Sequence, residues 1–326
     1  MSNARRVVMH ATGEADVMRI ETQVLPEPGP GEVRLRQTAI GFNYIDIYQR
    51  EGKYPLPLPS GLGHEAAGVV ERIGAGVEGL RPGDRVAYIN AGIGAYATAR
   101  NVPAERLVPI PAGIDDEQAA AVLFKGLTAQ YLLRKTHRVQ PGDVVLVHAA
   151  AGGVGQILCR WAKGLGATVL ATAGSPAKCE LARQAGADIA EDYSREGWAQ
   201  RLLDANGGRK ARVVYDSVGR ATFQQSLDCA APFGLVVLFG AASGPVDPID
   251  PEILARKGCL FLTRPSVFPH NADPATLRAN AAELFDAMAR GWVRADVCAR
   301  FALDDVVAMH RAAQSRATHG AVVMLP

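Results

Sequence analysis

One run of residues constrains the fold of this chain more than any other: "VLVHAAAGGVGQ", at 145–156. Apolar residues typical of a buried strand lead directly into a turn of small residues. The following segment, 154–166, has apolar residues at helical spacing. Within the turn, Ala150, Gly152 and Gly155 follow the A-x-G-x-x-G spacing, a variant of the glycine fingerprint found between a strand and a helix. The run therefore predicts a βα unit of a parallel sheet.

Strand and helix patterns alternate after this run, as they do in doubly wound sheets. Further apolar, β-branched segments are expected to be strands: 168–173, 187–193, 211–219, 234–240 and 258–265. A helix is expected at 175–186, where Ser175 and Pro176 suit the N-cap and the first turn. Another helix is expected from about 275, and 319–326 should close the chain as a strand. This part predicts an α/β fold with a doubly wound parallel sheet.

The first third of the chain has short strands and frequent turns instead. Residues 32–40 alternate Val and Leu with Arg, which is the period of a half-buried strand. Two more strands are expected at 67–74 and 84–89, separated by a stretch rich in turn residues. These patterns predict a compact, barrel-like β-rich module. A helical pattern follows at 115–135, and we expect Gly126 to break it.

Composition excludes several classes of protein. Hydrophobic residues make up 48% of the 326 residues and charged residues 21%, as in a soluble protein with a core. The net charge of +2 is too small to indicate a polyanionic partner such as a nucleic acid. No apolar run reaches the roughly 18 residues that suggest a membrane span, and no signal-peptide core is present. We expect a cytoplasmic protein without a membrane partner.

The cysteines are scattered, and no two lie within a few residues of each other. They are Cys159, Cys179, Cys229, Cys259 and Cys298. No C-x2-C pair is present to bind a metal, and an odd number does not suit a disulfide framework. We expect reduced, buried thiols.

The turn at 150–155 has the features of a dinucleotide-binding site. Gly152 allows the backbone to approach a pyrophosphate, and Gly155 allows the helix to pack closely on the strand. The free N–H groups and the positive end of the helix attract phosphate. A tight turn without a ligand is the alternative, but the strand–turn–helix context favours nucleotide binding.

The end of the next strand predicts which dinucleotide binds. Enzymes that use NAD usually have an acidic residue about 20 positions beyond the glycines, which accepts a hydrogen bond from the ribose 2′-hydroxyl. Here the segment reads "TAGSPAKCE", and its first acid is Glu180. Ser175 and Lys178 precede it, and a hydroxyl with a cation suits the 2′-phosphate of NADPH. The alternative for Lys178 is a solvated helix lysine.

Several segments together resemble the quinone oxidoreductase (zeta-crystallin-like) branch of the medium-chain dehydrogenase/reductases. They are "IGFNYIDIYQREGKYP", "GLGHEAAGVV", "FKGLTAQYLLRKT", "HAAAGGVGQ", "VVYDSVGR", "TRPS" and "SRATHG". The resemblance extends over nearly the whole chain. It implies a GroES-like catalytic domain at 1–125 and 266–326, and a Rossmann domain at 126–265. It also implies NADPH-dependent quinone reduction in a cleft between the domains, and a homodimer joined through the Rossmann sheet edges.

The resemblance assigns cofactor contacts position by position. In the first domain and the segment after it, they are Asn43, Asp46, Tyr48 and Thr128. In the glycine-rich turn they are Gly152, Gly153, Val154 and Gly155. For the 2′-phosphate they are Gly174, Ser175, Lys178, Tyr193 and Arg316. Along the nicotinamide–ribose path they are Ser217, Phe239, Gly240 and Arg264. Tyr193 and Arg316 rest on the resemblance alone.

The segment "GLGHEAAG" raises the question of zinc, because zinc-dependent alcohol dehydrogenases use the histidine of such a Gly-His-Glu sequence as a ligand. The cysteine ligand that lies 21 residues before it in those enzymes is Asn43 here, and an amide oxygen is a poor zinc ligand. The third ligand falls at Phe124 or Lys125, and the structural zinc lobe is missing. We expect no metal. A site improvised from Asp46, His64 and the adjacent glutamate is the alternative.

Without a metal, the reaction depends on positioning and on a donor near the quinone oxygen, which gains negative charge as it is reduced. The candidates are Tyr48, Asn43 and Tyr54, and Tyr54 is favoured. Lys125 is another donor of suitable chemistry. An aromatic loop residue that covers the core is the alternative role for Tyr54.

Two other functions are open. An NADPH-dependent enone or enal reductase would use the same cofactor and donors, but would deliver hydride to carbon. A protein of another class is the second alternative, since relatives in this branch bind AU-rich RNA or serve as structural lens proteins. The weak net charge of this chain gives RNA binding little support.

Overall fold

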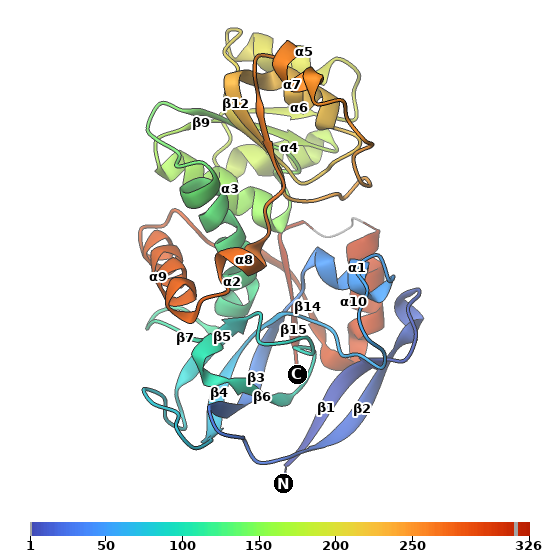
Figure 1. Ribbon diagram of the computed structural model, residues 1–326, viewed down its shortest axis with the longest axis vertical. Helices are drawn as coiled ribbons and strands as arrows, with labels where there is room; N and C mark the ends of the chain where they lie inside the picture. Colours follow the sequence, from blue (N-terminus) through green and yellow to red (C-terminus); the bar gives the residue numbers. More distant parts are fainter. Residues whose placement is uncertain (1, 316–318) are drawn as a thin grey trace. The chain divides into compact units, whose positions relative to one another are not determined.

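The computed structural model describes residues 2–315 and 319–326, which form two compact units (Figure 1). The first unit comprises Met1–Leu127, Asn271–Phe285 and Arg294–Pro326. The second comprises Thr128–His270 and Asp286–Val293. The predicted domain limits, which differ slightly from these, stay a prediction.

The second unit contains a six-stranded sheet in the order β10-β9-β8-β11-β12-β13, and its paired strands are parallel. Its strands are β8 (Val144–Val147), β9 (Thr168–Ala173), β10 (Ile189–Asp192), β11 (Ala211–Asp216), β12 (Ala230–Leu238) and β13 (Phe261–Thr263). Each lies within or close to a segment that the sequence predicts as a strand. The chain runs outward from β8 to β10 and returns to β11 beside β8, so the order reverses between β8 and β11.

Helices cover this sheet in the manner of a doubly wound fold. They are α3 (Gly153–Gly164), α4 (Pro176–Gln184), α5 (Trp198–Ala205), α6 (Phe223–Cys229) and α7 (Glu252–Arg256), while the short helix α8 (Val267–His270) follows β13. Helices α3 and α4 pack together against β8, β9 and β10, while α5 and α6 pack together and contact β10, β11 and β12. The core between sheet and helices includes Leu146, Trp198, Val214, Phe223 and Leu227, each at most 3% exposed.

The first unit is built on a seven-stranded sheet, β14-β15-β3-β4-β5-β7, in which β6 also pairs with β3, and on a separate β1–β2 pair. Its strands are β1 (Ser2–Met9), β2 (Met18–Leu25), β3 (Glu32–Gly41), β4 (Glu65–Ile73), β5 (Arg85–Ile89), β6 (Ala99–Pro103), β7 (Leu107–Pro109), β14 (Val297–Ala302) and β15 (Ala321–Leu325). Its central strands pair antiparallel, and only β14 and β15 pair in parallel within the part that the structure describes.

Two helices, α1 (Tyr44–Arg50) and α10 (Val306–Gln314), belong to this unit, and two longer ones, α2 (Asp116–Tyr131) and α9 (Pro274–Ala289), contain a boundary between the units. Shorter helical turns occupy η1 (Ala15–Val17), η2 (Ala104–Arg106), η3 (Leu132–Thr136) and η4 (Leu303–Asp305). The core of the unit gathers side chains from the sheet and from α1 and α10, among them Leu35, Ile47, Tyr88, Tyr96 and Met309.

Two expectations were wrong. Gly126 does not break its helix but lies inside α2, where a Cβ atom would come 2.5 Å from Leu284 Cδ1. The glycine therefore permits close packing with α9 instead of ending the helix. The thiols are all free in the described part, but Cys259 and Cys298 are exposed rather than buried. Cys259 lies in the loop before β13 and Cys298 on β14, beside solvent.

Among residues 2–315 and 319–326, no helix combines the length and apolar character needed to cross a membrane.

Candidate functional site

The glycine-rich turn joins the end of β8 to the start of α3, as predicted. Gly152 occupies the N-cap position of α3 and has an extended backbone. Because glycine has no side chain, it does not cap the N–H groups at the start of the helix. A Cβ atom on Gly155 would lie 2.4 Å from the carbonyl oxygen of Ala149, so only glycine allows this approach of helix to turn. Ala149 itself has a φ of 50°, a left-handed conformation that is costly outside glycine. A glycine turn at the N-terminus of a helix is the kind of place where phosphate groups bind in other proteins.

The described residues of the predicted 2′-phosphate group lie beyond the ends of β9 and β10 and in the first turn of α4. The hydroxyl of Ser175 accepts a hydrogen bond from the backbone N–H of Lys178 at 3.3 Å, which caps α4. A Cβ atom on Gly174 would come 3.1 Å from the hydroxyl oxygen of Tyr193. The backbone N–H of Tyr193 donates to Ala173 at 3.0 Å and fixes that contact. Arg316, the remaining predicted member, lies outside the described residues.

The loops after β11 and β12 hold another group of predicted residues close together. A Cβ atom on Gly240 would lie 2.7 Å from the carbonyl oxygen of Ser217. The backbone N–H of Phe239 donates to Asp216 at 2.9 Å, and Arg264 Nη1 lies 3.5 Å from the carbonyl oxygen of Gly240. These loops sit at the carboxyl ends of neighbouring strands, where doubly wound sheets bind ligands. Thr128 lies in α2 and is buried.

In the first unit, the predicted residue Asp46 is fully buried near the start of α1. Its Oδ2 accepts hydrogen bonds from the backbone N–H of Asn43 at 3.0 Å and from the hydroxyl of Tyr96 at 2.8 Å. Its Oδ1 is buried and has no hydrogen-bond partner among the residues that the structure describes. Burial raises the pKa of Asp46 from 3.8 to about 7, against the opposing effect of these hydrogen bonds. The carboxyl group can therefore hold or release a proton near neutral pH.

Beside it, the carboxylate of Glu65 collects donors from separate segments. Its Oε1 accepts from the Asn43 amide at 2.8 Å and from the Lys125 ammonium at 3.2 Å. Its Oε2 accepts from the backbone N–H of Phe124 at 2.7 Å. Lys125 also donates to the carbonyl oxygen of Phe42 at 2.8 Å. Burial raises the pKa of Glu65, and the Lys125 charge and the hydrogen bonds oppose that rise.

His64 has a protein partner and a neutral ring. Its Nε2 lies 3.0 Å from Gln49 Oε1, and burial lowers its pKa to about 4. The groups next to it do not suit zinc, because the Lys125 ammonium and the Asn43 amide N–H both donate to the carboxylate of Glu65. Within the described residues, no group of three His, Cys, Asp or Glu side chains could hold a metal ion.

The predicted donors Tyr48 and Tyr54 belong to a row of tyrosines. The ring centroids of Tyr44 and Tyr48 are 5.2 Å apart and those of Tyr48 and Tyr54 are 5.4 Å apart, both in edge geometry. Lys53 Nζ lies 5.7 Å from the Tyr48 ring centroid. Tyr54 is 41% exposed, so its ring can contact a bound molecule. Its role in catalysis stays a prediction.

Sequence reasoning missed the residues that hold these groups. Tyr96 contacts Asp46 across 50 positions of the chain, and its hydroxyl also lies 3.4 Å from His310 Nε2. Gln49, the partner of His64, lies on α1. No local pattern marks such contacts, because they depend on which strands and helices meet in the fold.

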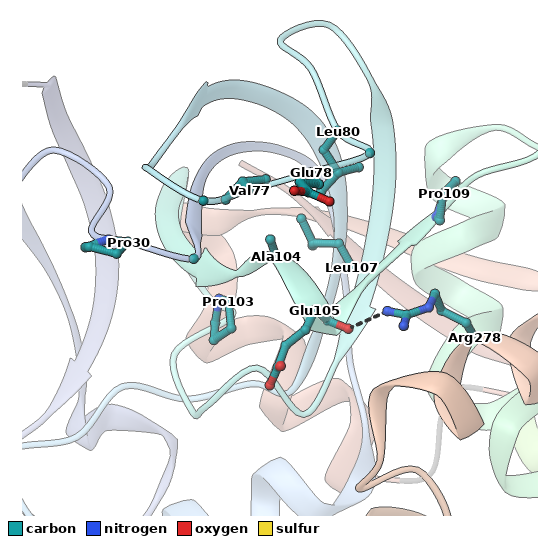
Figure 2. Close-up of a pocket in the computed structure, with 13 residues that line it drawn as sticks. Pro30, Val77, Glu78, Leu80, Pro103, Ala104, Glu105, Leu107, Pro109 and Arg278 are labelled. Carbon is teal, nitrogen blue, oxygen red and sulfur yellow. Dashed lines mark hydrogen bonds between the residues drawn. The ribbon is translucent and has the colours of Figure 1, made fainter.

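A separate cavity of about 670 Å³ lies in the first unit (Figure 2). Val77, Leu80 and Leu107 line it, and Arg278 Nη1 donates to the backbone oxygen of Glu105 at 3.3 Å at its edge. None of the predicted site residues that the structure describes lines this cavity. It is therefore not the site that the sequence predicts.

Comparisons with known proteins agree with this geometry. The family model described as "Alcohol dehydrogenase GroES-like domain" matches residues 29–112, and the one described as "Zinc-binding dehydrogenase" matches residues 153–269. The chain is 49% identical to a quinone oxidoreductase of Pseudomonas aeruginosa, over 99% of this chain and 100% of that protein. The chain belongs to the quinone oxidoreductase family. The GroES-like and Rossmann fold, which the sequence predicts, is confirmed.

Two further relatives are informative. The crystal structure of the Escherichia coli quinone oxidoreductase complexed with NADPH superimposes with a TM-score of 0.95 and is 43% identical, covering 99% of this chain and 100% of that one. A 2-haloacrylate reductase of Burkholderia is 42% identical over 98% of both proteins. The relatives of this chain therefore include proteins named for quinone reduction and for 2-haloacrylate reduction.

The raised pKa of Asp46 gives a prediction for stability. Between about pH 4 and pH 7 the folded state holds a proton that the unfolded state has lost, so this contribution to stability is lost as pH rises through about 7. Asp46→Asn keeps an acceptor and cannot ionise. The difference in free energy of unfolding between Asp46→Asn and the wild type should therefore shift in favour of the variant by about 2 kcal/mol from about pH 5 to pH 8.

Urea unfolding at several pH values measures this difference. Asp46→Ala is the matched control, because it removes the charge and also the acceptor for Asn43 and Tyr96. It should follow the same pH trend at a lower stability. A difference between Asp46→Asn and wild type that does not change with pH would contradict the assignment.

Proposed function

We propose that this protein is an NADPH-dependent quinone oxidoreductase. The observation that carries the proposal is 49% identity to a quinone oxidoreductase over essentially the full length of both chains. The glycine-rich turn at the carboxyl end of β8 supports it, since its geometry suits a pyrophosphate. NADPH, when bound, supplies the reducing electrons.

The residues after β9 favour NADPH over NADH. Ser175, Lys178 and Tyr193 come from the loop and strand ends that face the expected position of the adenosine ribose. A carboxylate at this place would repel a 2′-phosphate, and the loop at 174–179 has none. The Lys178 ammonium and the two hydroxyl groups can donate to phosphate oxygens. Selection of NADPH therefore rests on charge and on donor chemistry.

For the reaction itself, the chain contributes positioning and proton donors. Asn43, Asp46 and Tyr48 would contact the cofactor, and the exposed ring of Tyr54 would contact the quinone. The phenol hydroxyl of Tyr54 can donate a hydrogen bond to the carbonyl oxygen that gains charge. Lys125 and Glu65 hold Asn43 in place through the hydrogen bonds to the Glu65 carboxylate. No step needs a metal donor set, and the residues present do not fit one.

Reduction of an activated alkene is the second candidate. It is favoured by the 42% identity to a 2-haloacrylate reductase over 98% of both chains. The same cofactor site would serve, and the same donors would act on the carbonyl or carboxyl group conjugated to the double bond. RNA binding finds no comparable support, because the net charge is only +2.

The proposal includes a homodimer joined at the edge of the parallel sheet. Strand β13 is the last strand of that sheet, and Phe261 on it is 62% exposed. Phe233, which also is 62% exposed, lies nearby, since its N–H donates to Gly258 just before β13. An exposed sheet edge with large apolar side chains favours pairing with a second copy. Sedimentation as a monomer at micromolar concentration would contradict this.

NADPH oxidation assays test the reaction. We expect faster turnover with a 1,2- or 1,4-quinone than with a small alkenone. Tyr54→Phe should lower kcat/KM for the quinone roughly tenfold, because it removes a donor to developing charge while keeping the ring. Inactivity with quinones together with rapid alkenone turnover would assign the second candidate function instead.

The choice of NADPH is tested at Lys178. Lys178→Ala should raise KM for NADPH by roughly 10- to 100-fold and leave KM for NADH nearly unchanged, because it removes a charge-assisted bond to the 2′-phosphate. Lys163→Ala is the matched control, since Lys163 is a helix lysine of the same unit that pairs with Asp188. An unchanged ratio of NADPH to NADH preference in Lys178→Ala would contradict the assignment.

A further inference from the structure

A chain of buried polar side chains crosses the second unit just beneath the ends of its central strands. His148 follows β8, and its Nδ1 lies 2.6 Å from the hydroxyl oxygen of Thr172 on β9. Its Nε2 lies 2.9 Å from the hydroxyl oxygen of Ser226 on α6. Ser226 in turn donates to Asp216 Oδ2, at the end of β11, at 2.8 Å. All four side chains are 0% exposed, so they cannot take part in reactions with solvent or substrate as a Ser-His-Asp hydrolase would.

The carboxylate of Asp216 favours one direction for the bonds of this hydrogen-bonded chain. Asp216 only accepts, from the backbone N–H groups of Val218 and Gly219 and from the hydroxyl groups of Thr222 and Ser226. The Ser226 hydroxyl has one proton, and the acceptors near it are Asp216 Oδ2 at 2.8 Å, the Thr222 carbonyl oxygen at 3.0 Å and, in one tautomer, His148 Nε2 at 2.9 Å. A carboxylate is the strongest of these acceptors, so the arrangement favours the tautomer in which His148 Nε2 donates to Ser226. In the neutral ring, Nδ1 then accepts from Thr172.

The neutral form of His148 agrees with its surroundings. Burial lowers the pKa of His148, and the ring of Trp198 covers the imidazole in edge geometry at 5.4 Å between centroids. His148 and Ser226 thus each have a partner on both sides. Buried polar groups destabilise the folded state unless each of them is hydrogen-bonded. When all are hydrogen-bonded, the network holds its side chains rigidly.

The hydrogen-bonded side chains from Thr172 to Asp216 join the strand ends from which the predicted cofactor loops start. The backbone N–H of Ala150, in the glycine-rich turn, donates to Thr172 at 3.0 Å, and that of His148 donates to Tyr215 at 3.0 Å. The N–H of Phe239 donates to the Asp216 carbonyl oxygen at 2.9 Å. Asp216 also fixes the turn after Ser217 through its bonds to the next N–H groups. The loops after β8, β9, β11 and β12 therefore share one buried connection.

We propose that Thr172, His148, Ser226 and Asp216 form a positioning relay, which holds the dinucleotide-binding loops in their binding geometry before the cofactor arrives. The inference rests on the proposed function, because it assumes that these loops bind NADPH. It assigns to His148 a role distinct from that of the glycines beside it. The relay increases the affinity for the cofactor, because loops that are already ordered lose less conformational entropy on binding than flexible loops would.

Substitutions at Thr172 separate the hydrogen bond from packing. Thr172→Val keeps the shape and removes the hydroxyl, whereas Thr172→Ser keeps the hydroxyl and removes a methyl group. Thr172→Val should raise the Kd for NADPH roughly three- to tenfold, because a buried hydrogen bond is lost and a ring nitrogen is left without its donor. Thr172→Ser should keep the Kd within about twofold of the wild type and show only a lower Tm.

Tyr215→Phe is the matched control for a purely structural effect. Tyr215 is also fully buried on β11, and its hydroxyl donates to the carbonyl oxygen of Leu132 at 3.0 Å, outside the relay. This variant should lower the Tm as Thr172→Val does and leave the Kd for NADPH unchanged. Equal Kd values for Thr172→Val and Tyr215→Phe, or an equal rise in Kd for Thr172→Ser, would overturn the proposal.

Amide hydrogen exchange without cofactor completes the test. Thr172→Val should speed exchange at the amides of 150–153 and 217–219, while Tyr215→Phe should not. If the wild type fails to bind NADPH, the proposed function fails, and the exchange data still decide whether the relay orders these loops. Unchanged exchange in Thr172→Val would overturn the relay whatever the cofactor proves to be.

Discussion

The functional part of the first unit depends on the buried carboxylate of Glu65. A fully buried carboxylate is unstable unless it is paired and hydrogen-bonded, and here the donors come from the entry to α1 and from the middle of α2. Asn43 and Lys125 must therefore hold their positions for the unit to fold around this charge. The same contacts place Tyr44, Asp46 and Tyr48, because these residues follow Asn43 directly on α1.

The second unit also contains a buried carboxylate that accepts several hydrogen bonds. Asp216 is buried and accepts from backbone and side-chain donors, so the turn after β11 is fixed by one carboxylate. In each unit a buried acid orders a loop that carries predicted site residues. Each acid restrains the backbone because backbone N–H groups and side chains of a few segments donate to it. Rigid loops of this kind lose little conformational freedom when a ligand binds.

The sequence predicts the local features of this protein well. The glycine spacing, the Ser175 cap and the strand–helix alternation depend on neighbours in the chain, and the structure has all of them. Gly126 was predicted wrongly because contact with Leu284 overrides helix propensity at that position. The bonds from Tyr96 to Asp46 and from His148 to Ser226 could not be predicted, since they join residues 50 and 78 positions apart.

The name of one matching family model raises the question of zinc again, and the buried charges answer it. That model covers residues 153–269, which lie in the nucleotide-binding unit and do not include His64, Asn43 or Lys125. The match therefore concerns the Rossmann fold. In the first unit, the Lys125 ammonium 3.2 Å from Glu65 supplies the positive charge that this buried carboxylate needs. A divalent ion at the same place would meet an ammonium group and an amide N–H donor, so these residues do not fit a metal ion.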